Sequence, residues 1–121
     1  YYRITEGILR NPYVNVLAHP LYAFSFLFTD EMKPNAISNF PEIYIREIMK
    51  LAASEGKAVE LNASEVHLMN DLWFQYGDAF GTRYSIGSDS HKPQTVCEIQ
   101  PSLDAMKKYG ISEDHIIQPG R

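Results

Sequence analysis

A chain of 121 residues with 45% hydrophobic residues is long enough to bury the core of one domain. Its net charge of −4 argues against a broad nucleic-acid-binding surface, and it lacks an apolar run of membrane-spanning length or a signal-peptide pattern at its start. We therefore expect a cytoplasmic globular domain. The single cysteine, Cys97, excludes an internal disulfide and is interpreted as a small buried apolar residue.

The first half of the chain contains two predicted helices and one predicted strand. Residues 2–9 favour a short helix that stops before a proline. Residues 13–18 form a near-continuous apolar run, typical of a strand buried in a parallel sheet, and this run ends at His19. A second helix is expected from Glu42 to about Gly56. Its buried face should carry Ile45, Ile48, Met49 and Ala52.

Residues 21–39 lie between these elements and are aromatic but irregular. A loop of this length is usually functional, disordered or a lid. The alternation of aromatic residues is equally typical of a strand, or of a hydrophobic arm that covers a neighbouring subunit. The sequence leaves these alternatives open.

The second half continues the alternation of strands and helices. Residues 57–62 predict a strand that places Glu60 and Asn62 on one face. Residues 64–80 predict a helix whose apolar stripe is formed by Met69, Leu72, Trp73, Tyr76 and Phe80. A further strand begins at Tyr84 and breaks at Gly87. The helix that follows should end at Tyr109 and bury Ile99, Leu103 and Met106, and residues 112–117 favour a short helix or strand. This order predicts a parallel α/β fold.

Polar side chains follow each of the three predicted strands. His19 follows the first strand, Asn62 ends the second, and Asp89 and His91 follow the third. An Asp-x-His pair alone is more typical of a solvated turn before a helix. However, the carboxyl ends of parallel strands meet at one edge of the sheet, where ligands bind. The four residues together therefore predict a site for zinc, manganese or iron, ligated by one oxygen and two nitrogens.

Other polar residues have simpler interpretations. Glu60 is interpreted as the partner of a neighbouring cation, and His67 and His115 as solvent-exposed side chains. For Asn62 two alternatives stay open, since it either faces the site or caps the following helix.

Three motifs carry a specific resemblance to a known family. The segments Val-Leu-Ala-His-Pro (16–20), Val-Glu-Leu-Asn (59–62) and Ile-Gly-Ser-Asp-Ser-His (86–91) resemble, in that order, the last three motifs of the PHP (polymerase and histidinol phosphatase) domain family. The resemblance covers about residues 15–117 and implies that 1–121 is the carboxyl-terminal portion of a single such domain. It further implies a distorted TIM-like barrel of seven β/α units and histidinol-phosphatase-like hydrolysis of a small phosphorylated substrate. Two or three divalent metal ions would serve this reaction.

By this resemblance, His19 is a ligand of one metal, Asp89 of a second and His91 of a third. Asn62 would line the pocket or orient a ligand.

The resemblance also has a large gap. The family's opening His-x-His pair, its other upstream histidines and its bridging glutamate have no counterpart in this sequence. Because patterned sequence begins at Tyr1 without a methionine, we expect the chain to be a piece of a longer protein. Activity is expected only with the missing amino-terminal half, and the exposed sheet edges predict association with that half or with a second copy.

Two further alternatives remain. The chain could be a catalytically incompetent metal-binding or structural module, as are some family domains attached to DNA polymerases. A flavodoxin-like binding domain is least favoured, because the sequence lacks a glycine-rich phosphate loop.

Overall fold

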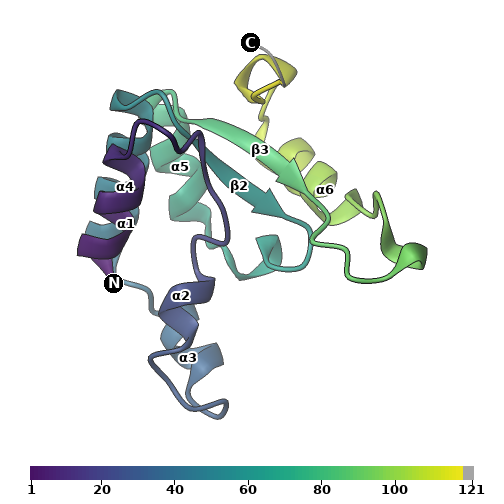
Figure 1. The fold of residues 1–121 in the computed structure, drawn as a ribbon, viewed down its shortest axis with the longest axis horizontal. Helices are drawn as coiled ribbons and strands as arrows, with labels where there is room; N and C mark the ends of the chain where they lie inside the picture. Colours follow the sequence, from purple (N-terminus) through teal and green to yellow (C-terminus); the bar gives the residue numbers. More distant parts are fainter. Residues whose placement is uncertain (119–121) are drawn as a thin grey trace.

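A three-stranded parallel sheet organises the computed structural model, which describes residues 1–118. The strands are β1 (Val16–Leu17), β2 (Ala58–Asn62) and β3 (Arg83–Gly87), and they lie side by side in chain order. Leu17 pairs with Val59, which pairs in turn with Tyr84. Consecutive parallel strands need helical crossovers, and the chain supplies them between each pair (Figure 1). The predicted parallel α/β class is therefore confirmed.

Four longer helices and several short turns accompany the strands (Figure 1). The longer helices are α1 (Tyr2–Arg10), α4 (Glu42–Ser54), α5 (Asp71–Phe80) and α6 (Gln100–Tyr109), and α4 and α5 lie in the two crossovers. The shorter ones are α2 (Tyr22–Ser25), α3 (Lys33–Ser38) and the 3₁₀ turns η1 (Val66–Leu68), η2 (Pro93–Thr95) and η3 (Glu113–His115). In Figure 1, α2 and α3 project together below the sheet and helices α1, α4 and α5.

All four longer helices pack against the same face of the sheet. Side chains of α1, α4 and α5 bury one continuous core with Leu17, Val59, Leu61 and Tyr84, and α6 packs at its margin. Because successive side chains of a strand alternate, Ala58, Glu60 and Asn62 point to the opposite face, as do their β3 neighbours. This second face carries the polar residues of the sheet.

The predicted helix of residues 42–56 is confirmed, and its expected stripe is completely buried. The prediction for residues 64–80 was wrong at its start, since the segment forms η1 and then a separate helix α5. The break has a local cause, because the Asn70 side chain accepts a hydrogen bond from the backbone N–H of Leu72 at 3.1 Å and caps α5. At its other end, Gly81 adopts φ +67, the left-handed conformation that closes a helix.

Other boundaries also differ from expectation. The first strand is reduced to two residues, because a turn occupies the start of the expected run. Residues 21–39 form no strand but two short helices, α2 and α3. Residues 112–117 contain η3, after which Ile116 bridges to Tyr84 in parallel.

Two burial predictions were wrong. In α6 the buried residue is Ser102, whereas Leu103 is 39% exposed. The helix is turned this way because the Ser102 hydroxyl donates a 2.7 Å hydrogen bond to the carbonyl oxygen of Leu61. Cys97 is exposed rather than buried, since it lies in the loop between η2 and α6 with φ +66.

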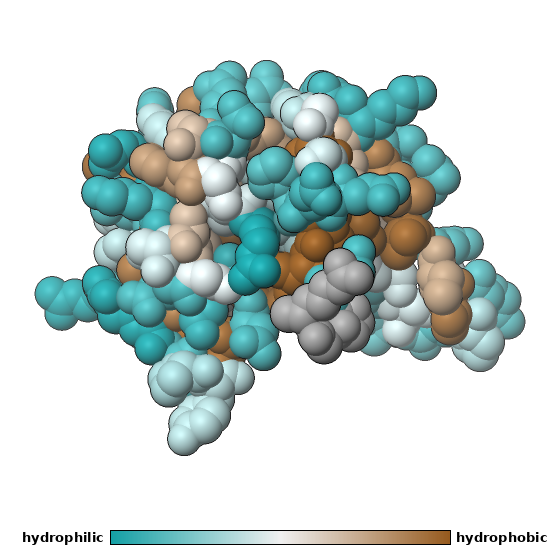
Figure 2. Space-filling view, turned by 90° about the horizontal axis from the view of Figure 1, so that it is seen from above, coloured by the Kyte–Doolittle hydropathy of each residue, from teal (hydrophilic) through white to brown (hydrophobic). Residues whose placement is uncertain are grey.

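The outer surface is mostly hydrophilic in the view of Figure 2, with apolar side chains gathered between the polar ones. No helix within residues 1–118 is long and apolar enough to cross a membrane.

Candidate metal site

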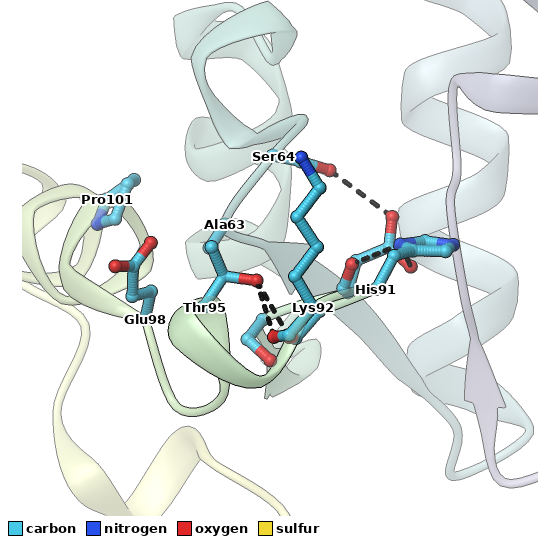
Figure 3. A pocket seen from close by; sticks show the side chains of 10 residues that line it. Ala63, Ser64, His91, Lys92, Thr95, Glu98 and Pro101 are labelled. Carbon is cyan, nitrogen blue, oxygen red and sulfur yellow. Dashed lines mark hydrogen bonds and ion pairs between the residues drawn. The ribbon is translucent and has the colours of Figure 1, made fainter.

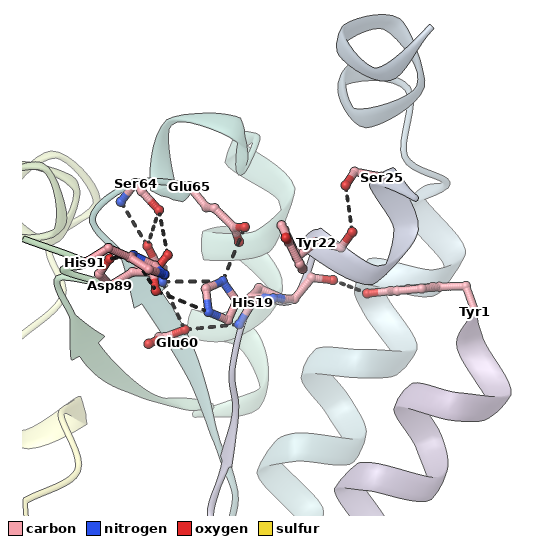
Figure 4. A network of polar contacts seen from close by, with 11 residues as sticks. Tyr1, His19, Tyr22, Ser25, Glu60, Ser64, Glu65, Asp89 and His91 are labelled. Atoms are coloured by element: carbon pink, nitrogen blue, oxygen red, sulfur yellow. Dashed lines mark hydrogen bonds and ion pairs between the residues drawn. The ribbon is translucent and has the colours of Figure 1, made fainter. Parts of the chain in front are cut away.

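His19 and Asp89 meet at the carboxyl edge of the sheet (Figure 4). Each follows a strand by two residues, His19 after β1 and Asp89 after β3. The Nε2 atom of His19 lies 3.8 Å from Oδ1 of Asp89. Both residues have positive φ, 48° and 52°, which turns the backbone sharply as it leaves the strand. The structure thus brings together two of the predicted ligands from β1 and β3, the strands on either side of β2.

His91 lies beside this pair but is less enclosed. Its side chain is 81% exposed, and its Nδ1 lies 3.9 Å from Oδ1 of Asp89. Nδ1 also lies 2.7 Å from the backbone carbonyl oxygen of Asp89 and donates a hydrogen bond to it. A histidine that donates through Nδ1 presents Nε2 as the nitrogen that can ligate a metal. His91 therefore stands at the outer rim of the site.

Glu60 also contacts His19, and the prediction made for Glu60 was wrong. We expected Glu60 to pair with a cation, but its Oε2 accepts a 3.0 Å hydrogen bond from the backbone N–H of His19. Gly87 makes room for this carboxylate, because a Cβ at that position would lie 2.4 Å from Oε1 of Glu60. The strand alternation had placed Glu60 on the same face as Asn62, and this was the signal that it belongs to the site.

Asn62 is buried, with 1% exposure, at the centre of these contacts. Its Oδ1 accepts hydrogen bonds from the backbone N–H and the hydroxyl of Ser64, at 2.9 and 2.6 Å. These bonds aim its Nδ2 at Nδ1 of His19 and Oε2 of Glu60, each 3.5 Å away. Of the two alternatives, Asn62 therefore faces the site, and the cap of the following helix is Asn70 instead.

Glu65 is the site residue that the sequence did not indicate. Its Oε1 lies 3.3 Å from Nδ1 of His19, although its side chain is only 15% exposed. Burial raises the pKa of the Glu65 carboxyl, the contact with His19 opposes this rise, and the charges of Glu60 and Asp89 add to it. Its other oxygen, Oε2, is buried without a hydrogen-bond partner in the described part of the chain.

The donor chemistry fits part of a metal site. Two carboxylates, from Glu65 and Asp89, face the ring nitrogens of His19 and a third, from Glu60, accepts its backbone N–H, and a cation would offset their repulsion. A metal with ligand distances of about 2.0–2.2 Å can bridge a nitrogen and an oxygen that lie 3.8 Å apart. Yet no group of three or more histidine, cysteine, aspartate or glutamate side chains within residues 1–118 is arranged to hold a metal. The chain therefore supplies two converging ligands, His19 and Asp89, rather than a complete coordination sphere.

A hollow of about 370 Å³ opens beside Asp89 (Figure 3). It lies between the loop after β2, the loop after β3 and the start of α6, and hydroxyl groups contribute much of its lining. Lys92 extends along it and Glu98 lies on the opposite side in Figure 3. The hydroxyl of Ser64 connects the hollow to the site, because it lies 3.5 Å from Oδ2 of Asp89.

His67 and His115, the two remaining histidines, are exposed as predicted. They lie on η1 and η3, and neither joins the cluster around His19.

Comparison with known proteins found no matching family model, no matching curated protein and no matching solved structure. The resemblance of the three sequence motifs to PHP domains thus stays a prediction.

Proposed function

We propose that the chain is the carboxyl-terminal portion of a PHP-type metal-dependent phosphoesterase domain. The observation that carries this proposal is the approach of His19 Nε2 to Asp89 Oδ1, at 3.8 Å, on the carboxyl edge of a parallel sheet. These are the two ligands that the family motifs place after the first and the third of the three strands. Catalytic sites of parallel α/β folds lie at this edge.

In this proposal the chain's own residues bind metal ions or orient the metal ligands, and none acts as a nucleophile. His19 and Asp89 would hold divalent ions of zinc, manganese or iron, of which the intact domain would bind two or three. His91 adds a ligand through Nε2 at the rim. Bound divalent ions lower the pKa of a water molecule and neutralise charge on phosphoryl oxygens. Glu60 keeps His19 in place by accepting the hydrogen bond of its backbone N–H.

The hollow beside Asp89 is the proposed place of the substrate. Its volume of about 370 Å³ is that of a small-molecule site, and its hydroxyl-rich lining suits a polar leaving group. Lys92 is placed to attract the phosphate of a small phosphorylated substrate. The short helix α2 flanks the other side of His19, where the Tyr22 ring lies 5.5 Å from the imidazole, and α3 packs against α2. They are suited to control access, either as a lid or as an arm over a neighbouring subunit.

The sheet face opposite the four longer helices supports the barrel and association with a missing half. Parallel sheets are normally covered on both faces, yet all four longer helices pack on one face here. The other face carries Glu60 and Asn62, which suits the polar interior at the mouth of a distorted (β/α)7 barrel. The amino-terminal half of the domain, or a second copy of the chain, would cover this face and complete the set of metal ligands. The proposed location of this assembly is the cytoplasm.

A second candidate function is a catalytically incompetent module with a metal-binding or structural role. The exposure of His91, at 81%, favours it, because a catalytic ligand is usually enclosed. The two candidates differ in whether the metals support turnover.

Elemental analysis of zinc, manganese and iron on the purified chain tests the metal site. We expect bound metal in the wild type, a large loss in His19→Ala and Asp89→Ala, and no loss in His67→Ala, whose histidine is exposed on η1. Equal metal contents in all four proteins would contradict the site. Phosphatase assays of the longer protein with Asp89→Ala then separate the enzyme from the incompetent module.

A further inference from the structure

Glu65 contacts His19 on the edge of the ring that faces away from Asp89. Its Oε1 lies 3.3 Å from Nδ1, while Nε2 points to Asp89. We propose that Glu65 is a positioning residue that holds His19 in the tautomer protonated on Nδ1, which leaves the Nε2 lone pair for a metal. This inference rests on the proposed metal site for its purpose, but the tautomer can be measured without any metal.

Two side chains compete for Nδ1 of His19. The Glu65 carboxylate at 3.3 Å requires a proton on Nδ1, whereas the Asn62 amide nitrogen at 3.5 Å requires a lone pair there. Glu65 is nearer, and it is the stronger partner because a hydrogen bond to a charged group exceeds a neutral one. Asn62 has a second acceptor at the same 3.5 Å, Oε2 of Glu60, so its amide does not depend on His19. The geometry therefore favours the proton on Nδ1.

The burial of Glu65 is not explained by a structural role. Glu65 precedes η1, but its side chain makes no capping hydrogen bond to that turn. Its Oε2 is buried without a hydrogen-bond partner among the described residues, and such an atom is destabilising. The contact with His19 is the interaction that accounts for the orientation of the carboxylate.

The backbone of His19 is fixed independently of the ring. Oε2 of Glu60 accepts the His19 N–H at 3.0 Å, and φ of +48° sets the direction in which the side chain leaves the strand. Glu60 thus fixes the position of the residue, and Glu65 fixes the rotation and protonation of its ring. Histidines that ligate metals commonly donate their other ring N–H to a carboxylate in this way.

The tautomer of His19 is measured by ¹⁵N chemical shifts of the imidazole in the metal-free chain at about pH 9, where free histidine is neutral. We expect the Nδ1–H form in the wild type, and a shift toward the Nε2–H form in Glu65→Leu. Glu65→Gln should retain the Nδ1–H form, because its amide oxygen still accepts. Glu113→Leu, a change of an exposed glutamate on η3, is the control and should leave the spectrum of His19 unchanged.

Two results would overturn the proposal. One is an Nε2–H tautomer in the wild type, which needs no variant and so stands even if Glu65→Leu does not fold. The other is a folded Glu65→Leu chain that keeps the Nδ1–H form.

Titration with zinc separates this inference from the metal-site proposal. Loss of a positioning carboxylate typically weakens metal binding by about 10–100-fold, which we expect for Glu65→Leu, with a smaller loss for Glu65→Gln. A wild type that binds no zinc but has the expected tautomers would retain the role of Glu65 and refute the metal site. Equal zinc affinity in the wild type and in Glu65→Leu would refute the positioning role alone.

Discussion

Gly87 keeps the Glu60 carboxylate in contact with the backbone of His19, and Gly87→Ala tests this arrangement. The new Cβ would lie 2.4 Å from Oε1 and 3.4 Å from Cδ of Glu60, so the carboxylate must move. Its movement breaks the 3.0 Å hydrogen bond from the His19 N–H to Oε2. A hydrogen bond to a charged group contributes about 1.5–3 kcal/mol. Replacing glycine by alanine in a strand returns about 0.5–1 kcal/mol.

The net effect expected for Gly87→Ala is a loss of about 0.5–2.5 kcal/mol in the free energy of unfolding, by subtraction of these two contributions. Urea unfolding followed by the fluorescence of Trp73, the single tryptophan, measures it. In a Glu60→Ala background the same change should be neutral or slightly stabilising, because the obstructing carboxylate is gone. An equal cost in both backgrounds would refute the reasoning.

Three further expectations follow from the packing. Gly77→Ala should destabilise the chain by about 1–3 kcal/mol in urea unfolding, because a Cβ there would lie 1.8 Å from the Tyr84 hydroxyl, and adding Tyr84→Phe should recover part of the loss. Burial and then the charge of Asp78 raise the pKa of Tyr84 in the folded chain. The contribution of the neutral Tyr84 to stability is therefore complete below about pH 10 and is lost as the pH rises further. The urea midpoint of unfolding should thus fall less steeply above about pH 10 in Tyr84→Phe than in the wild type. Cys97 is exposed, so iodoacetamide should modify it in the folded chain at a rate near that in urea, and strong protection would contradict its placement.

The elements that were predicted correctly are those whose pattern is local. Helix α4 presents its apolar residues at helical spacing, and strand β2 alternates between two faces, so each could be predicted from its own residues. In helix α6 Met106 packs against the core as predicted, but Leu103 was predicted wrongly: the buried place is taken by Ser102, which donates to the carbonyl of Leu61, a partner 41 residues away. A serine on an apolar helix face gives no local sign of such a partner.

The site shows the same division between local and distant causes. His19 and Asp89 could be predicted to approach one another, because parallel strands bring their carboxyl ends to one edge. The role of Glu60 was missed because it depends on the space that Gly87 leaves in the neighbouring strand. Glu65 was missed because nothing in its local sequence distinguishes it from a solvated glutamate before a short turn.

Backbone strain gives an independent reason to regard this edge as functional. His19 and Asp89 both adopt positive φ, which costs a non-glycine residue roughly 1–2 kcal/mol, and glycine would avoid this cost at either position. The Glu60 carboxylate, which accepts the His19 N–H, helps to keep that residue in its strained conformation. Side chains that face each other at 3.8 Å from two strained positions are difficult to explain by stability alone. Strain of this kind is concentrated where a side chain must be aimed at a ligand, which agrees with metal binding by this pair.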